Sequence, residues 1–162
     1  MRNYKQLAIP DTVWTKPSHF VAFGFGSGTM PFAPGTFGTL MAIPFYLVLS
    51  LLPNFYYFIV LLFIIAGSMW LCDKVSQEIK IHDHPGMCID EFIGLFVALY
   101  GAPRGLWPII LGVLLFRLFD IWKPWPINVL DKKVKGGFGM IIDDVVAGIF
   151  SLIILHLVYW LV

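Results

Sequence analysis

Long apolar runs, separated by short polar or glycine-rich segments, make up most of the chain after residue 36. The five runs cover residues 37–52, 55–71, 91–100, 106–119 and 145–162. The first, second and last runs approach the roughly 20 residues with which a helix crosses a bilayer, whereas ten helical residues rise only about 15 Å. The pattern predicts an all-α, polytopic membrane bundle of about four to five hydrophobic helices, in which 91–119 forms a shortened or re-entrant hairpin.

Turn and capping residues set the expected helix boundaries. Pro34-Gly35 marks a turn and Thr36 is a good N-cap, so the first helix should begin there. Pro124 pushes the residue before it out of helical dihedral angles, so the fourth helix should end near Trp122.

The remaining segments complete the expected organisation. A tight hairpin at Pro53-Asn54 joins the first two runs. The second helix should extend a turn or two past Leu71, before a loop around residues 82–86. Residues 1–22 are polar and mixed, and we expect them to be an interfacial or soluble lead-in to a single membrane-embedded domain, 1–162.

Composition favours a membrane protein and excludes some partners. Hydrophobic residues make up 59% of the 162 residues and charged residues 13%, with a mean hydropathy of +0.82, which is unlike an ordinary soluble domain. The net charge of +1 argues against a nucleic-acid partner. The glycine-rich segments 24–28 and 35–39 lack the G-K-[ST] ending of a P-loop, so nucleotide binding is not supported.

Lysine and arginine are distributed unequally between alternate connections. Nine lie before the first run, between the second and third, and before the last: Arg2, Lys5, Lys16, Lys74, Lys80, Lys123, Lys132, Lys133 and Lys135. On the opposite side the sequence has Arg104 alone. The positive-inside rule therefore places the three basic segments in the cytoplasm.

This topology brings five carboxylates from three helix ends to one cytoplasmic layer. Asp90 and Glu91 begin the third helix, Asp120 lies at the end of the fourth, and Asp143-Asp144 should open the fifth. An unpaired acid near the bilayer centre costs about 2.5 to 3.5 kcal/mol. The acids are therefore either solvated at the interface or held together by a cation. Hard oxygen ligands favour Mg²⁺, which stabilises the ionised carboxylates.

Two cations and two hydroxyl groups fall in the same predicted layer. Arg117, three residues before Asp120, could hold a phosphate by bidentate hydrogen bonds, with Lys123 as a further positive charge. Thr36 and Thr39 lie at the entry of the first helix, whose N–H groups could bind an anion. Close helix packing through small residues explains the same glycine-rich segment equally well.

Each charged motif also has a purely structural interpretation. Asp143-Asp144 could complement the dipole of the last helix, and Arg117 and Asp120 could pair within one helix. A solvated helix start is an equal alternative for residues 90–91. A shared site is the stronger interpretation because positions far apart in sequence fall in one layer.

The histidines and cysteines carry weaker signals. His82 and His84 should be solvated rather than bound to a metal, and His156 should be a hydrogen-bonded histidine of the core. Cys72 and Cys88 form no C-x-x-C pair, and on the cytoplasmic side we expect reduced thiols.

Four blocks of sequence carry a family resemblance. They read G-S-G-T-M-P-F-A-P-G-T-F-G-T-L at 26–40, I-D-E-F-I-G at 89–94, F-R-L-F-D-I-W-K-P-W-P-I at 116–127 and G-G-F-G-M-I-I-D-D-V-V-A-G at 136–148. In these blocks, which span about 120 residues, the chain closely resembles the phosphatidylglycerophosphatase A family.

The resemblance implies a magnesium-dependent, multi-pass enzyme of the bacterial inner membrane with its active site facing the cytoplasm. Such an enzyme hydrolyses the terminal phosphate of phosphatidylglycerophosphate to give phosphatidylglycerol and inorganic phosphate. The substrate is implied by the family alone, because composition and spacing indicate only a membrane protein with a metal and phosphate site.

The expected mechanism uses the five acids together with the two cations. Mg²⁺, held by some of the acids, would bridge the phosphomonoester, while Arg117 and Lys123 neutralise charge on the phosphoryl oxygens. An acid that is not bound to the metal would act as general base or as covalent nucleophile, and both remain open. The catalytic and metal-binding candidates are Asp90, Glu91, Asp120, Asp143 and Asp144.

Two other functions were weighed against this one. A membrane phosphatidyltransferase would need a D-G-x-x-A-R type block, which the sequence lacks. A non-enzymatic transporter could use intramembrane charges, but here the charges are confined to one interface and only His156 lies within a helix middle.

Overall fold

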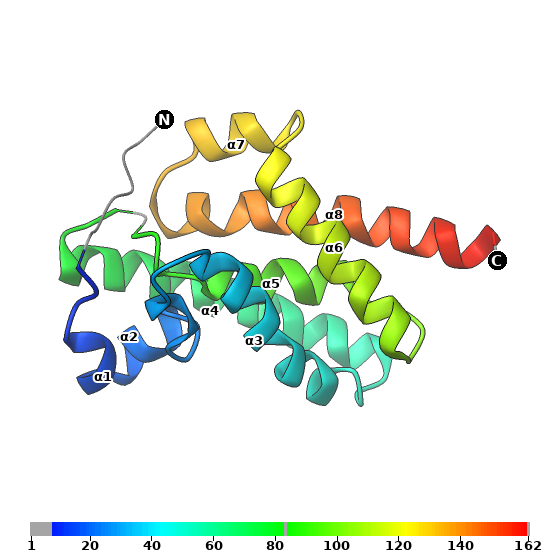
Figure 1. The fold of residues 1–162 in the computed structure, drawn as a ribbon, viewed down its shortest axis with the longest axis horizontal. Helices are drawn as coiled ribbons and strands as arrows, with labels where there is room; N and C mark the ends of the chain where they lie inside the picture. The colour runs from blue at the N-terminus through cyan, green and yellow to red at the C-terminus, as the bar shows by residue number, and fades with distance from the viewer. Residues whose placement is uncertain (1–7, 83, 162) are drawn as a thin grey trace.

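The computed structural model describes residues 8–82 and 84–161 as a helical bundle (Figure 1). Its elements are α1 (Thr12–Thr15), α2 (Pro17–Ala22), η1 (Ser27–Thr29), α3 (Pro34–Leu49), α4 (Asn54–Ile79), α5 (Ile89–Ala98), α6 (Leu106–Trp122), α7 (Ile127–Lys133) and α8 (Gly136–Leu161). No strand occurs in the described ranges, so the all-α prediction is confirmed there. Arg2 and Lys5, used above to orient the chain, lie outside the described residues.

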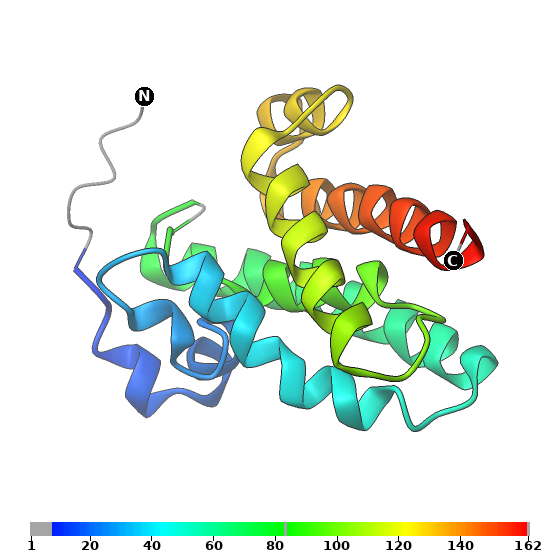
Figure 2. The ribbon, with the colours of Figure 1, turned by 45° about the vertical axis from the view of Figure 1, so that its right-hand side comes forward.

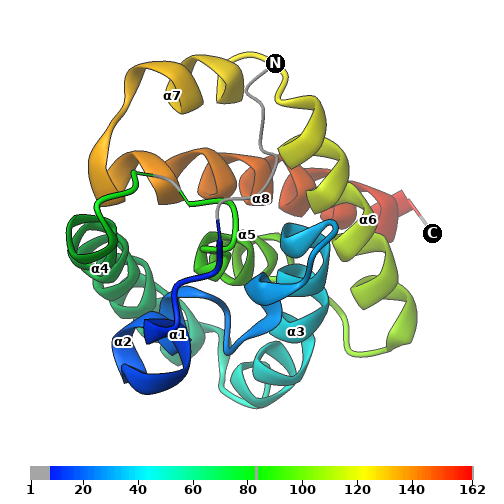
Figure 3. The same cartoon turned by 60° about the vertical axis from the view of Figure 1, so that its left-hand side comes forward.

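The short helix α5 occupies the centre of the bundle. Eight of its ten residues are buried, and it contacts α3, α4, α6 and α8, which surround it in Figure 3. A helix that is apolar on all sides is stable only when neighbours cover it. The sequence therefore predicted correctly that the third helix is short, and the structure shows that it is also the core helix.

A close crossing between α5 and α8 fixes the relation of these two helices. A Cβ atom at Gly148 would lie 2.5 Å from the carbonyl oxygen of Gly94 and 2.9 Å from Cβ of Val97. Only glycine allows the two backbones to approach this closely. The crossing places the first turn of α5 beside the third turn of α8, where the acidic residues of both helices lie.

Two predicted helix ends are confirmed. α6 ends at Trp122, and Lys123 follows in the left-handed region with φ of 45°. α4 continues past Leu71 to Ile79, which is about two turns. Both ends lie where polar residues follow an apolar run.

Two predicted helix starts are wrong. α3 begins at Pro34 after Ala33, so Thr36 lies in the first turn and is not the N-cap; proline is favoured at the first helical position because it has no N–H to satisfy. α8 begins at Gly136, so Asp143-Asp144 do not open it but lie two turns inside.

Packing on α4 explains the early start of α8. The N–H of Gly136 donates to Nε2 of His82 at 3.0 Å, and the backbone at Gly137 lies directly against that of Met69 in α4. These tertiary contacts stabilise a glycine-rich helical turn whose intrinsic helix propensity is low.

The described part of the lead-in folds against α4. Nζ of Lys16 lies 2.6 Å from Oε2 of Glu78, and Nε2 of the buried His19 lies 3.1 Å from the same oxygen. α1 and α2 are therefore held at the end of the bundle where α4 ends.

The helix ends gather in two layers, as Figure 2 shows. In one layer, Arg104 donates to the carbonyl oxygen of Ser50 at 3.3 Å. In the same layer, the hydroxyl of Tyr100 donates to the carbonyl oxygen of Asn54 at 3.4 Å. The other layer contains the ends of α4 and α6 and the starts of α3, α5 and α8. This agrees with the alternation expected from the sequence.

Two helices have the length and composition to cross a membrane. These are α4 and α8, with 26 residues each, and the shorter α3 is also apolar. Large apolar side chains such as Phe63, Leu114 and Trp160 point outward on these helices and on α6. An exposed apolar surface of this extent needs a partner other than water.

Candidate active site

A polar cavity of about 200 Å³ opens in the layer where α4 ends and α8 begins. Six acids, one lysine and two histidines line it: Asp90, Glu91, Asp120, Asp131, Asp143, Asp144, Lys123, His82 and His84. They come from α5, the end of α6, α7, α8 and the loop before α5. The structure thus brings all five acids proposed from the sequence to one cavity.

Lys123 lies between two of the acids. Its Nζ atom is 2.7 Å from Oδ1 of Asp131 and 2.7 Å from Oδ2 of Asp143. Burial opposes the charge of this ammonium group, but Asp143 and Asp131 raise the pKa of Lys123 above its ordinary value. The lysine is therefore a permanent positive charge in the wall of the cavity.

Asp143 and Asp144 are adjacent in α8 and almost fully buried, with 6% and 4% of their surface exposed. Asp143 is paired with Lys123. Asp144 has no lysine or arginine within ion-pair distance among the described residues, although Asp120 and Asp90 are close enough to act on its charge. Six acidic side chains therefore face one lysine, so acidic groups outnumber the cation that could balance them.

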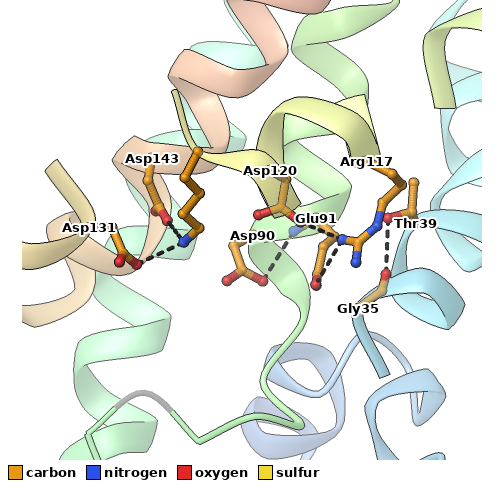
Figure 4. A network of polar contacts seen from close by, with 9 residues as sticks. Gly35, Thr39, Asp90, Glu91, Arg117, Asp120, Asp131 and Asp143 are labelled. Atoms are coloured by element: carbon orange, nitrogen blue, oxygen red, sulfur yellow. Dashed lines mark hydrogen bonds and ion pairs between the residues drawn. The ribbon is translucent and has the colours of Figure 1, made fainter. Parts of the chain in front are cut away.

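Arg117 lies behind the cavity and does not line it. Figure 4 shows its guanidinium group reaching toward Asp120 and Glu91 from one side. Its Nη1 atom is 2.6 Å from Oδ2 of Asp120 and 3.5 Å from Oε1 of Glu91. The structure therefore places Arg117 where it orients two acids of the cavity.

Gly35 allows the start of α3 to pack against this group. A Cβ atom there would overlap Oε1 of Glu91 and would lie 3.1 Å from Nη1 of Arg117. Two buried atoms of the group, Nε of Arg117 and Oε2 of Glu91, have no hydrogen-bond partner within the described structure. Buried polar atoms are normally satisfied, so an unmatched acceptor at the edge of a cavity suggests an absent ligand or water.

The two threonines proposed as phosphate ligands are not brought to the cavity. Thr39 is fully buried in α3, and its hydroxyl donates to the carbonyl oxygen of Gly35 at 2.9 Å. Thr36 lies in the first turn of the same helix. Neither side chain lines the acidic cavity.

The donor atoms suit magnesium in kind, although they are not arranged around an ion. Among residues 8–82 and 84–161, no three histidine, cysteine, aspartate or glutamate side chains are close enough to hold a metal as they stand. Asp120 and Asp143 are instead engaged by Arg117 and Lys123. The carboxyl oxygens, the excess of acidic groups over cations and the unmatched Oε2 of Glu91 fit Mg²⁺.

Three residues of the cavity were not assigned to it from the sequence. His84 is 1% exposed, so its expected solvation is wrong, and its Nδ1 accepts from the N–H of Gly86 at 3.0 Å. His82 accepts from the N–H of Gly136. Asp131 lies on α7, a short helix between the fourth and fifth predicted runs. The only sequence feature that could have pointed to Asp131 is its position between an apolar pair and two lysines, in V-L-D-K-K at 129–133.

The remaining histidine and the cysteines lie elsewhere. His156 is exposed, so its placement in the core is wrong, although its Nδ1 donates to the carbonyl oxygen of Leu152 at 3.0 Å. Cys72 and Cys88 are buried and form no disulfide, as expected. Burial raises the pKa of the Cys88 thiol above its ordinary value, so this thiol stays protonated.

Comparisons with known proteins agree with the family resemblance. The profile of the family described as Phosphatidylglycerophosphatase A matches residues 20–159. Phosphatidylglycerophosphatase A of Escherichia coli (strain K12) is 40% identical over 156 residues, covering 96% of this chain and 91% of the relative. The protein of the same name from Haemophilus influenzae is 42% identical over 150 residues, covering 90% and 91%.

A third relative has a different name. A Bacteroides thetaiotaomicron protein with the provisional name phosphatidylinositol-3-phosphatase is 35% identical over 151 residues, covering 88% of this chain and 93% of the relative. No solved structure matches the chain significantly. The profile match and the identities over nearly the full length show that the chain belongs to the phosphatidylglycerophosphatase A family.

Proposed function

We propose that this protein hydrolyses the terminal phosphomonoester of phosphatidylglycerophosphate at the acidic cavity, giving phosphatidylglycerol and inorganic phosphate. The observation that carries the proposal is the convergence of six acids and Lys123 on one cavity in a chain of this family. Two of the named relatives are phosphatidylglycerophosphatases.

The size of the cavity supports a phosphate group as the part of the substrate that enters. Its volume of about 200 Å³ is below the roughly 300 to 1,000 Å³ of pockets that enclose whole drug-sized ligands. The acyl chains of the lipid would remain in the bilayer while the headgroup reaches the acids.

The second part of the proposal is a multi-pass membrane protein with the acidic cavity at the cytoplasmic side. The lengths of α4 and α8 and the outward apolar side chains support embedding. The excess of lysine in the acidic layer, against Arg104 in the other, supports the orientation. α5 and the longer α6 would form the shortened hairpin.

The third part is a magnesium ion held by some of Asp90, Glu91, Asp120, Asp143 and Asp144. When bound, the ion supplies positive charge against the phosphoryl oxygens and lowers the pKa of water. Lys123 neutralises further charge on the phosphate, and Arg117 keeps two of the acids in position. An acid free of the metal either removes a proton from the attacking water or attacks phosphorus itself. In both cases the bond from phosphorus to the glycerol oxygen breaks, and that oxygen gains a proton. When the acid attacks phosphorus, water must then hydrolyse the resulting acyl phosphate, which frees inorganic phosphate and restores the carboxylate.

Phosphate release by the purified full-length protein tests the proposal. We expect release from phosphatidylglycerophosphate in the presence of Mg²⁺, slower release from phosphatidic acid and phosphatidylinositol 3-phosphate, and none after chelation. The third lipid is included because of the name of the Bacteroides relative. A preference for either alternative lipid would overturn the substrate assignment, and full activity after chelation would overturn the metal assignment.

A further inference from the structure

The layer opposite the acidic cavity carries a second hollow surface, between the end of α3 and the turn that leads into α6. Two cavities adjoin there, of about 270 Å³ and about 420 Å³. They share four lining residues, Tyr46, Ser50, Leu51 and Arg104. Figure 2 shows the two chain turns that form this surface at the same end of the bundle.

Arg104 supplies the charge of this surface. One Nη atom donates to the carbonyl oxygen of Ser50 at 3.3 Å, and the residue lines both cavities. No acid within the described ranges forms an ion pair with it. A guanidinium group has five N–H donors, so most of them remain available to an anion.

Tyr46 supplies a second polar group between the two cavities. It is 4% exposed and lines both of them. No described residue forms a hydrogen bond with its hydroxyl group, whereas the hydroxyl of nearby Tyr57 donates to the carbonyl oxygen of Phe96 at 2.8 Å. The hydroxyl of this largely buried side chain is free to donate, and it lies close enough to Arg104 to feel its charge, so the two groups together suit an anionic oxygen.

Most of the other residues that line the larger cavity are apolar. Leu47, Val48 and Ile109 line it, and the first two are exposed on the outer surface of α3. The apolar surface therefore continues directly from the polar groups toward the middle of the bundle.

We propose that this double cavity binds an anionic phospholipid in the membrane leaflet opposite the active site. The lipid phosphate would contact Arg104 and the Tyr46 hydroxyl, and one acyl chain would lie against Leu47, Val48 and Ile109. An arginine beside an apolar groove at headgroup depth matches the charge and shape of such a lipid. The proposal depends on the membrane embedding proposed above, but not on the phosphatase reaction.

Lipid retention by the purified full-length protein, measured by native mass spectrometry in detergent, tests this site. The probes are dioleoylphosphatidylserine, which is neither substrate nor product of the proposed reaction, and zwitterionic dioleoylphosphatidylcholine with the same chains. We expect one tightly retained phosphatidylserine. Arg104→Gln should weaken its binding about fivefold to tenfold, whereas Arg104→Lys should retain most of it. Ile109→Trp, which fills the apolar cavity, should weaken binding without any change of charge.

Lys135→Gln is the matched control, because it removes one exposed cation from the other layer. It should leave retention unchanged. Equal binding of the two lipids, wild-type binding by Arg104→Gln, or displacement of the lipid by millimolar inorganic phosphate would each overturn the proposal. Phosphate release, measured in parallel, should be the same for Arg104→Gln as for the wild type. Loss of release in all samples would contradict the proposed reaction and leave the lipid site standing.

Discussion

Nζ of Lys123 and Oδ2 of Asp143 lie 2.7 Å apart, which joins the residue after α6 to a residue two turns inside α8. The lysine also contacts Asp131 of α7, so a single ammonium group connects three helices around the acidic cavity. It is the only cation among the described residues that line this cavity.

Replacing Lys123 should therefore impair catalysis strongly. Lys123→Met keeps an unbranched side chain that is one atom shorter, but removes the charge that offsets Asp143 and a bound phosphate. Loss of one preorganised charge at a reacting oxygen typically costs about 10² to 10³ in kcat. Phosphate release at saturating lipid measures the effect. Lys135→Gln, in the connection that follows α7, is the control, and a similar loss in both variants would contradict a specific role.

Neutralising Asp144 should separate activity from stability. Asp144 is almost fully buried, and burial and the neighbouring acids both oppose its ionisation, so an amide of the same shape removes the cost of keeping a carboxyl group there without metal. We expect Asp144→Asn to abolish phosphate release and to raise the Tm measured without Mg²⁺ by about 2 to 4 °C, the equivalent of about 1 kcal/mol.

The other acids extend this test. Asp90→Asn, Asp120→Asn and Asp143→Asn should each remove Mg²⁺-dependent release while the protein stays in the membrane fraction. Near-normal activity in two or more of the four variants would count against the metal assignment.

Arg117→Lys should reduce activity although it preserves the charge. The guanidinium group reaches Asp120 and Glu91 together, and a lysine cannot reproduce this planar fork. We expect kcat/KM to fall about tenfold to a hundredfold, because two acids of the cavity lose their fixed positions. Arg104→Lys, in the opposite layer, provides the same chemical change as a control. An unchanged kcat/KM in Arg117→Lys would show that the pairing is only structural.

The sequence was sufficient to predict the layer in which the five acids lie. Charges at the ends of apolar runs, such as Glu91, Asp120 and Lys123, must fall on one side when the runs alternate in direction. This argument needs only the direction of each helix. For the same reason the end of α6 at Trp122 was predictable from Pro124 alone.

The rotation of each side chain about its helix axis was not predictable in this way. Arg117 and Thr39 lie in the correct layer, yet neither lines the cavity. The start of α8 was missed because packing against α4 stabilises its glycine-rich first turn. Asp131 was missed because a seven-residue helix has too few residues to show a period.

The glycine crossing between α5 and α8 provides a test of how the cavity is held together. In Gly148→Leu, the new side chain would begin 2.5 Å from the carbonyl oxygen of Gly94, so α8 must move away from α5. Overpacking of this kind typically costs about 1 to 3 kcal/mol. We expect a lower Tm in detergent and little phosphate release, because Asp144 moves with α8.

Gly67→Ala is the matched control. A Cβ atom at that position meets nothing within 4 Å, and alanine favours a helix over glycine by about 1 kcal/mol. This variant should keep full activity and an equal or higher Tm. If Gly148→Leu retained wild-type activity, the spacing of α5 and α8 would not determine the geometry of the acids.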